Sequence, residues 1–426
     1  MKSWLAHLPQ CLYWLVFALA FCLPFSTSAV TVAALLILLC WIVEGDFARK
    51  CSEVAASPIC RALLVYVGVM VLGLFWSDSW LEGLGMIQHR WKILFLPILL
   101  TVIRWDCRRS YSNAFVGGVL FTVIVIDLAY FGVFHQLGIT SKKFFFDRIV
   151  NHMVSTPMLA FAIYLLWEQI LWRAERDWQY WSLSLLTCLL SLNIFLMRGR
   201  SGLFAFIVLM FLLSYQYFKK SILRALLVPA VIFPIILIGA YYSSPVFQLR
   251  MNNIVENISD FDKNQKTSVG FRLHYWSTSW LLIKEHPWGG VGTGDFASSY
   301  LQLNQQRSPD IGTTNNPHNQ YIFLTAQLGV IGLAALLGLF LVFFREASRR
   351  EDGLERVRIA FPLFFMTIML SESYLDITGT GFLYSLFGAL LFKKPLPVPD
   401  QGEAEQRRLP TAAALCDKPS YDSPLR

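Results

Sequence analysis

Long apolar runs, separated by short polar connections, recur along most of the chain. Most of the runs are long enough to cross the hydrocarbon core of a bilayer as a helix. They lie at residues 11–25, 29–43, 61–76, 90–103, 114–134, 153–172, 181–197, 202–218, 223–242, 320–344, 357–373 and 379–392. This pattern predicts an all-α polytopic membrane protein with about twelve transmembrane helices.

The composition agrees with this interpretation. Hydrophobic residues make up 55% of the 426 positions and charged residues only 15%, and the mean hydropathy is +0.51. These values exclude an ordinary soluble globular protein.

The first apolar run follows Lys2 and resembles a cleavable signal peptide. Because a second run follows almost at once, we favour an uncleaved helical hairpin over that alternative.

The distribution of basic residues predicts the orientation of the chain. Lys and Arg accumulate in cytoplasmic connections, and most of the 36 in this chain do so if the N-terminus is inside. Both termini are then cytoplasmic. The predicted organisation is transmembrane helices 1–9 in residues 1–242, a large outer loop in 243–319, helices 10–12 in 320–394, and a polar, proline-rich, disordered cytoplasmic tail in 395–426.

The large outer loop contains one predicted helix and one glycine-rich turn. In SVGFRLHYWSTSWLLIKEHPW (268–288), Leu273, Trp276, Trp280 and Ile283 recur at helical spacing. We expect an amphipathic helix at the membrane surface with its indoles at headgroup depth. The following GGVGTGDF (289–296) is not preceded by the strand of a nucleotide-binding unit. It is therefore interpreted as a connection that lets its backbone approach a neighbouring segment.

Basic residues also occur in outer connections, where the orientation rule disfavours them. They are Lys142, Lys143, Arg148 and His152 in one connection, Arg198 and Arg200 in the tight turn MRGRSG, and Arg250 and Arg272 in the large loop. Guanidinium groups bind phosphate oxygens in pairs and remain charged at any working pH. This cationic face is therefore expected to bind a lipid diphosphate.

Each basic residue also has a simpler interpretation. The two lysines can snorkel or bind anionic headgroups, which is the preferred interpretation for them. Arg272 can stack on neighbouring aromatic rings, Arg250 can anchor the preceding helix, and Arg148 is open to either role. A ligand-binding role is favoured for Arg198 and Arg200, because a short turn between two apolar helices has little structural need for two guanidiniums.

His318 lies in NNPHNQYIFLTAQLG, immediately before an apolar run. We expect Asn315 or Asn316 to cap the helix, with Pro317 in its first turn. A neutral imidazole can accept a proton from a hydroxyl group, and the positive helix terminus and nearby arginines disfavour the imidazolium form. His318 is therefore a candidate general base. Taken alone, its position is explained somewhat better by a residue that only caps or anchors the helix.

The carboxylates offer two further hypotheses. Asp260 and Asp262 form a D-x-D motif, but their loop is polar and has no other carboxylates close by. We favour a solvated loop over a metal site and predict no metal and no cofactor. Glu372 and Asp376 could orient a base or a substrate, and Asp127, inside an apolar run, must pair or face a cavity. Glu372 and Asn319 are included among the candidate substrate-binding residues.

The order of three segments resembles a known family. The segments are RGRSG (198–202), FRLHYWSTSWLLIKEHPWGGVGTGDF (271–296) and HNQYIFLTAQLGVIGL (318–333), and the family comprises the O-antigen ligases with their relatives, the O-antigen polymerases and protein O-oligosaccharyltransferases. The resemblance implies a metal-independent, inverting glycosyltransferase of the GT-C type. It would move a polysaccharide from undecaprenyl diphosphate to the lipid A-core at the periplasmic face of a bacterial inner membrane.

The resemblance also assigns roles to residues. His318 would be the base, while Arg198, Arg200 and Arg272 would hold the diphosphate or an acceptor phosphate. The short chain with one large outer loop favours a ligase over a polymerase. A transporter or flippase for the same glycan is disfavoured, because such proteins place their charges at mid-membrane. A non-catalytic scaffold for envelope assembly stays open.

Overall fold

The computed structural model describes residues 7–130, 133, 152–175, 177–197, 199–243, 247–249, 251–252 and 268–394. Within these ranges the regular structure is entirely helical, and each of the predicted apolar runs contains a helix. Seven of the described helices are long and apolar enough to cross a membrane, which confirms an all-α polytopic membrane protein. The count of twelve crossings stays a prediction. The predicted tail, residues 395–426, lies outside the described part.

The N-terminal part of the chain is a series of apolar helices. In order, they are α1 (Leu8–Cys22), α2 (Thr27–Glu44), α3 (Phe47–Ala56), α4 (Pro58–Leu72), the 3-10 helix η2 (Gly73–Trp76), α5 (Trp80–His89), α6 (Trp91–Leu94), α7 (Leu96–Val102), η3 (Trp105–Cys107) and α8 (Arg108–Tyr130). Helices α1 and α2 pack side by side. The turn between them is set by Ser26, whose Oγ accepts a hydrogen bond from the Ala29 N–H at 3.2 Å and caps α2.

The C-terminal part contributes the centre of the bundle and its outer end. The helices are α11 (His152–Trp172), α12 (Trp178–Leu196), α13 (Arg200–Tyr217), α14 (Ile222–Ser243), α16 (Ser268–Glu285), α17 (Phe296–Arg307), α18 (Gln320–Ser348), α19 (Glu355–Ile368) and α20 (Thr378–Phe392). Asp127 accepts hydrogen bonds from Asn193 Nδ2 of α12 at 2.8 Å to each carboxylate oxygen, which confirms that this acid is paired.

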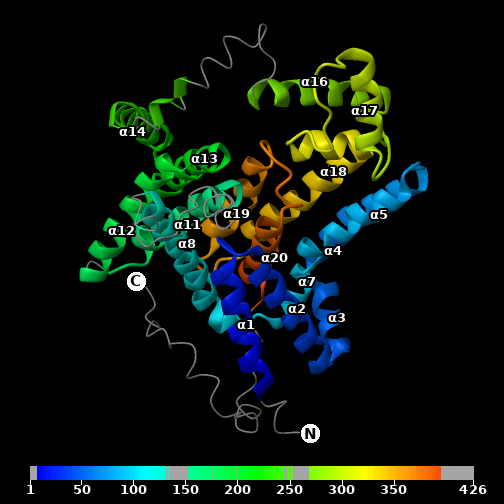
Figure 1. The fold of residues 1–426 in the computed structure, drawn as a ribbon. Coiled ribbons are helices and arrows are strands. Elements are labelled where there is room, and N and C mark those ends of the chain that lie inside the picture. Colours follow the sequence, from blue (N-terminus) through cyan, green and yellow to red (C-terminus); the bar gives the residue numbers. More distant parts are fainter. Residues whose placement is uncertain are drawn as a thin grey trace.

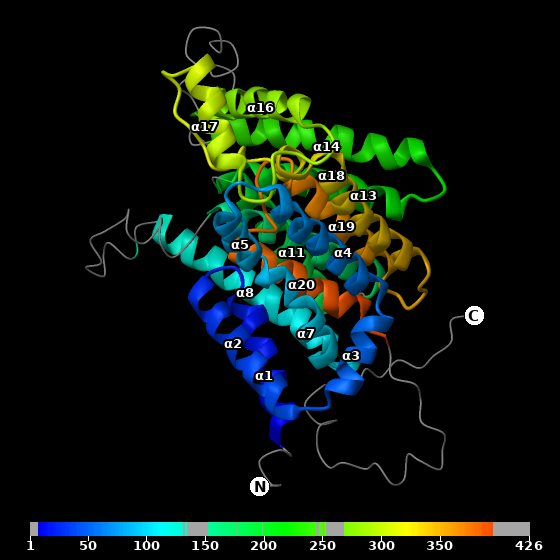
Figure 2. The same ribbon diagram turned by 90° about the vertical axis from the view of Figure 1, so that its right-hand side faces the viewer.

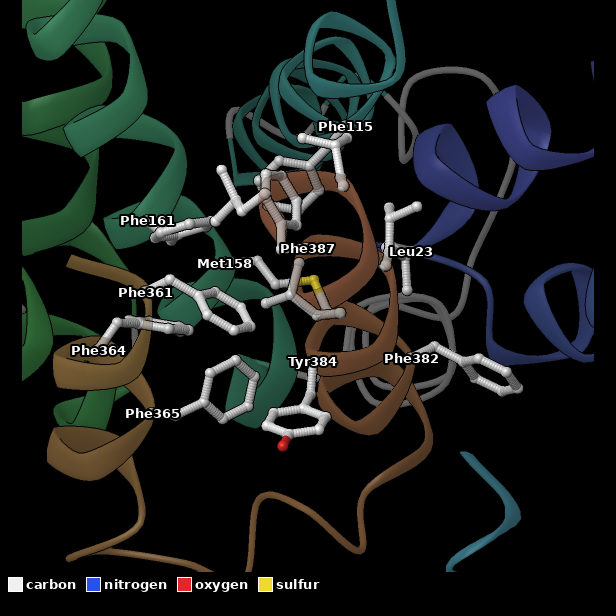
Figure 3. Packing of buried hydrophobic residues seen from close by; sticks show 14 of the residues in the cluster. Leu23, Phe115, Met158, Phe161, Phe361, Phe364, Phe365, Phe382, Tyr384 and Phe387 are labelled. Carbon is white, nitrogen blue, oxygen red and sulfur yellow. The ribbon is translucent and has the colours of Figure 1, made fainter. Parts of the chain in front are cut away.

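Helix α20 lies at the centre of the bundle. Every side chain from Gly379 to Phe392 is buried, and α7, α11 and α19 pack around the helix. Aromatic rings dominate the contact surface (Figure 3): the ring centroids of Phe161 and Phe387 are 5.0 Å apart and those of Phe365 and Tyr384 are 5.4 Å apart. Lipid is as apolar as these side chains, so close packing rather than exclusion of water holds them together.

Helix α18 is interrupted at Gly329, whose φ of +60° and ψ of −157° are not helical. A Cβ at this position would lie 2.1 Å from the Trp288 carbonyl oxygen, so only glycine fits. The glycine-rich turn contacts the broken helix directly: the N–H groups of Val291 and Gly292 donate to the carbonyls of Ala326 and Gln327 at 3.0 and 2.9 Å. The predicted close backbone approach is therefore confirmed.

Helices α16 and α17 lie at the end of the bundle opposite α3, and α16 runs across that end (Figures 1 and 2). A second hydrophobic cluster, which includes Ile283, Phe296, Tyr300 and Phe323, packs them against the first half of α18. The predicted helix is confirmed, while the headgroup depth of its indoles stays a prediction; the four residues of its apolar stripe differ in their surroundings. Trp276 donates its indole N–H to the Pro317 carbonyl at 2.9 Å, and Ile283 is buried.

Leu273 and Trp280 are exposed, so the four residues of that stripe do not share one environment. The reason is that α16 has α18 on one side and α17 on another. Its apolar positions are therefore divided between protein contacts and the outer surface.

Candidate functional site

His318 lies just before α18, in a strained backbone conformation. Its φ is +56°, and its N–H donates to Asn316 Oδ1 at 2.9 Å. The sequence-based cap was wrong: Asn319 is the N-cap, and its Oδ1 accepts from the N–H groups of Tyr321 and Ile322 at 3.0 and 3.2 Å. The left-handed conformation at His318 stops the helix from starting earlier. Asn315, Asn316 and Pro317 therefore lie outside it.

Asn319 also reaches the connection between α19 and α20. Its Nδ2 donates to the Leu370 carbonyl at 3.1 Å, and the Gln320 N–H donates to the Met369 carbonyl at 2.9 Å. The side chain is buried. It acts here as a helix cap that ties two segments together, and these contacts give the predicted substrate-binding role of Asn319 no support.

The imidazole of His318 pairs with Glu372. Nδ1 lies 2.6 Å from Glu372 Oε2, and the two side chains are 37% and 7% exposed. The second carboxylate oxygen accepts from the Ser373 N–H at 3.0 Å and from Asn316 Nδ2 at 3.5 Å. Among the described residues, none forms a hydrogen bond with the second ring nitrogen, Nε2, and the ring of Tyr275 lies next to the imidazole, with centroids 6.2 Å apart.

This arrangement determines which ring nitrogen can act as a base. An ionised carboxylate accepts the proton on Nδ1, so the lone pair is placed on Nε2, and it also stabilises the imidazolium that forms when Nε2 takes up a proton. From the sequence, the helix terminus and nearby arginines are expected to keep His318 in its basic form. The structure adds a buried carboxylate as the orienting group, one of the two roles suggested for Glu372.

Asp376, the other acidic candidate of this connection, has a different partner. It forms an ion pair with Arg90, whose side chain is 1% exposed. Lys92 Nζ donates to the backbone carbonyl of Asp376 at 2.8 Å. Asp376 therefore holds the 371–377 connection against the start of α6 and does not contact His318.

Two of the predicted arginines, Arg200 and Arg272, lie in the described part, and Tyr374 links them to the connection that carries Glu372. Arg200 is the first residue of α13, Arg272 lies in the first turns of α16, and the two guanidiniums are within electrostatic range of one another. Arg272 is also within electrostatic range of Tyr374, and Tyr374 shares a 2.5 Å hydrogen bond with Ser201. No carboxylate among the described residues pairs with either guanidinium.

Tyr374 links the elements of the site. Its hydroxyl contacts Ser201 of α13 and donates to the Met153 carbonyl of α11 at 3.1 Å. Burial raises the pKa of Tyr374 to about 12, so the hydroxyl stays protonated. Neither Tyr374 nor Ser201 was singled out from the sequence, although Tyr374 lies only two residues after Glu372.

Several predicted residues fall outside the part of the chain that the structure describes. Lys142, Lys143, Arg148, Arg198, Arg250 and the D-x-D carboxylates Asp260 and Asp262 lie outside the described residues, and His152 begins α11 with its side chain outside the description. Among the described residues, no three His, Cys, Asp or Glu side chains are grouped so that they could hold a metal ion. Of the basic residues predicted to bind a phosphate, Arg200 and Arg272 are the ones whose side chains the structure describes.

Two comparisons with known proteins bear on this site. The family model for O-antigen ligase matches residues 185–337, a region that contains Arg200, Arg272 and His318. An uncharacterized protein of Haemophilus influenzae is 22% identical over 320 residues, which cover 70% of this chain and 76% of that protein. The match over residues 185–337 confirms the resemblance of this chain to the O-antigen ligase family.

Proposed function

We propose that this protein is an O-antigen ligase, which transfers a polysaccharide from undecaprenyl diphosphate to a sugar hydroxyl of the lipid A-core. The observation that carries the proposal is the His318–Glu372 pair, 2.6 Å apart. Arg200 and Arg272, which interact with one another and have no acidic partner among the described residues, support it. A base and unpaired cations are the two groups that this transfer needs.

In the proposed reaction, His318 Nε2 takes the proton of the acceptor hydroxyl. The hydroxyl oxygen forms a bond to the anomeric carbon of the donor sugar while the bond from that carbon to the diphosphate oxygen breaks. The bonding electrons leave with undecaprenyl diphosphate. A single displacement of this kind inverts the anomeric configuration, and Glu372 holds the imidazolium until its proton is lost.

Arg200 and Arg272 would stabilise the charge that develops on the departing diphosphate. A guanidinium offers two parallel donors to phosphate oxygens, and preorganised charge of this kind contributes several kcal/mol to a transition state. Arg198 precedes Arg200 by two residues, and we assign it the same role. We assign Arg148, His152, Arg250, Lys142 and Lys143 to binding the lipid-linked donor.

We also propose how the chain crosses the membrane. The chain would cross a bacterial inner membrane about twelve times in a GT-C-type arrangement, with residues 243–319 as the periplasmic loop and residues 395–426 as a cytoplasmic tail. The active site would face the periplasm and both termini the cytoplasm. The positions of α16 and α17 at one end of the bundle support this arrangement.

The experiment uses purified protein in nanodiscs, a lipid-linked O-polysaccharide and lipid A-core, without an energy source. Wild type is expected to shift the acceptor to a polymer-bearing band on a gel, and His318→Ala is expected to abolish the shift while the protein remains folded. His286→Ala is the matched control, because His286 is an exposed histidine just beyond the end of α16.

Three results would contradict the proposal. Normal transfer by His318→Ala would remove the base. Lengthening of the lipid-linked glycan without any product on lipid A-core would indicate the polymerase of the same family. Movement of the intact donor across the bilayer without transfer would indicate a flippase.

A further inference from the structure

A cavity of about 410 Å³ shares Asn316 with the surroundings of the His318–Glu372 pair. Glu82 and His89 of α5 line one part of it, and Asn315, Asn316 and Asp376 line another. Asn316 connects the cavity to the site, because its side chain also contacts the His318 N–H and Glu372. The volume falls within the range of about 300 to 1,000 Å³ that is usual for ligand sites.

The cavity is built by a close approach of α5 to the glycine-rich turn. A Cβ on Gly294, whose φ is +107°, would lie 2.4 Å from the backbone nitrogen of Gly83. The Asp295 carboxylate accepts from the N–H groups of Asp78 and Ser79 at 2.8 and 2.7 Å, which anchors the start of α5. The wall that carries Glu82 is therefore held at a defined distance from the turn.

The side chains that line the cavity differ in charge from the arginines that are proposed to bind the diphosphate. The lining combines two carboxylates, two primary amides and an imidazole with the rings of Phe296 and Phe323, and no Lys or Arg among the described residues belongs to it. Carboxylates and amides are suitable partners for hydroxyl groups, and aromatic rings pack on apolar faces. A phosphate would meet carboxylates here and would be repelled.

We propose that this cavity binds an uncharged sugar of the acceptor and presents its hydroxyl to His318. The assignment rests on the proposed function and adds to it a separate place for the acceptor. The diphosphate of the donor is held by the arginines, while the acceptor sugar is held by Glu82 and Asn315. Asp376 is a positioning residue, because its ion pair with Arg90 fixes the wall of the cavity.

The test fills or alters the cavity and measures binding and kinetics separately. The variants are Ala297→Trp, which places an indole into the cavity from its lining, and Glu82→Gln. Two binding probes are used. The first is dephosphorylated core oligosaccharide released from lipopolysaccharide, whose binding to the protein in nanodiscs is measured by saturation-transfer NMR. The second is undecaprenyl diphosphate. Glu285→Gln, an exposed carboxylate at the end of α16 outside the lining, is the matched control.

Ala297→Trp is expected to abolish oligosaccharide binding, and Glu82→Gln to weaken it about tenfold, as for the loss of one hydrogen bond from a charged group. Binding of undecaprenyl diphosphate should not change. In the transfer assay, Glu82→Gln should raise the KM for lipid A-core by about the same factor and leave kcat and the donor KM within twofold. Glu285→Gln should behave as wild type.

The outcomes separate this inference from the proposed function. If wild type transfers no glycan but Ala297→Trp still loses the oligosaccharide, the transferase proposal fails and the sugar site stands. Wild-type oligosaccharide binding by both cavity variants would overturn the sugar site whatever the transfer assay shows. A change in the KM of the donor instead of the acceptor would overturn it as well.

Discussion

Replacement of Glu372 by Gln tests the orienting role of this carboxylate with little change in shape. Oε1 accepts from Ser373 N–H and Asn316 Nδ2, at 3.0 and 3.5 Å. These two donors will hold the amide oxygen of a glutamine in the Oε1 position. The amide NH₂ then faces His318 Nδ1, which must become a hydrogen-bond acceptor, and the ring proton moves to Nε2. The base is then protonated on the nitrogen that should accept.

The expected loss of kcat has two causes: general base catalysis by His318 is impaired, and the negative charge of Glu372 is removed. A positioned general base contributes about 10² to 10⁴ in rate, and we expect kcat of Glu372→Gln to fall about 100- to 1,000-fold. That corresponds to about 3–4 kcal/mol of activation free energy. Stability should change little, because the substitution removes a charge from a side chain that is only 7% exposed.

The assay is transfer from the lipid-linked glycan to lipid A-core under saturating donor and acceptor, with thermal unfolding in detergent as the folding control. Glu372→Asp keeps the charge but shortens the side chain, so its kcat should lie between those of wild type and Glu372→Gln. If Glu372→Gln keeps more than half of the wild-type kcat while its unfolding curve is unchanged, the carboxylate does not orient the base.

Three further predictions concern other residues. Arg200→Lys and Arg272→Lys should each lower kcat at least about tenfold, because an ammonium keeps the charge but loses the paired donors; equal activity with lysine would reduce the role to charge alone. Asn319→Ala should destabilise the protein by about 1–2 kcal/mol through loss of the helix cap, seen as a lower Tm in detergent, and an unchanged Tm would show that the cap contributes nothing. Gly329→Ala should cost about 1–3 kcal/mol, because a Cβ would meet the Trp288 carbonyl and the φ of +60° disfavours other residues; Gly338→Ala, with open space around its Cβ, is the control and should be neutral or stabilising.

The helical class of the fold was predictable because a bilayer permits few structures. Backbone groups in lipid must be satisfied within the segment, so an apolar run such as residues 223–242 has little choice but a helix. The break in α18 was not predictable in the same way. Gly329 stands in an apolar run, and only the turn at residues 287–292, distant in sequence, supplies partners for the interrupted backbone.

The sequence predicted several residues of the candidate site, but it did not predict which carboxylate contacts His318. His318 and Glu372 are 54 residues apart, and the sequence alone offered Glu372 and Asp376 as equal partners. The structure distinguishes the two carboxylates. The buried guanidinium of Arg90 forms an ion pair with Asp376, whereas Glu372 contacts His318. Tyr374 and Ser201 were missed because neutral hydroxyls give no signal until the chain is folded.

Trp276 sits one turn of α16 beyond Arg272 and is hydrogen-bonded to the carbonyl of Pro317, directly before His318. Helix α16 is thereby tied to the backbone next to the strained residue at the start of α18. A displacement of α16 that keeps this hydrogen bond must therefore also move the backbone next to His318, so the position of the helix that carries Arg272 is coupled to the start of α18.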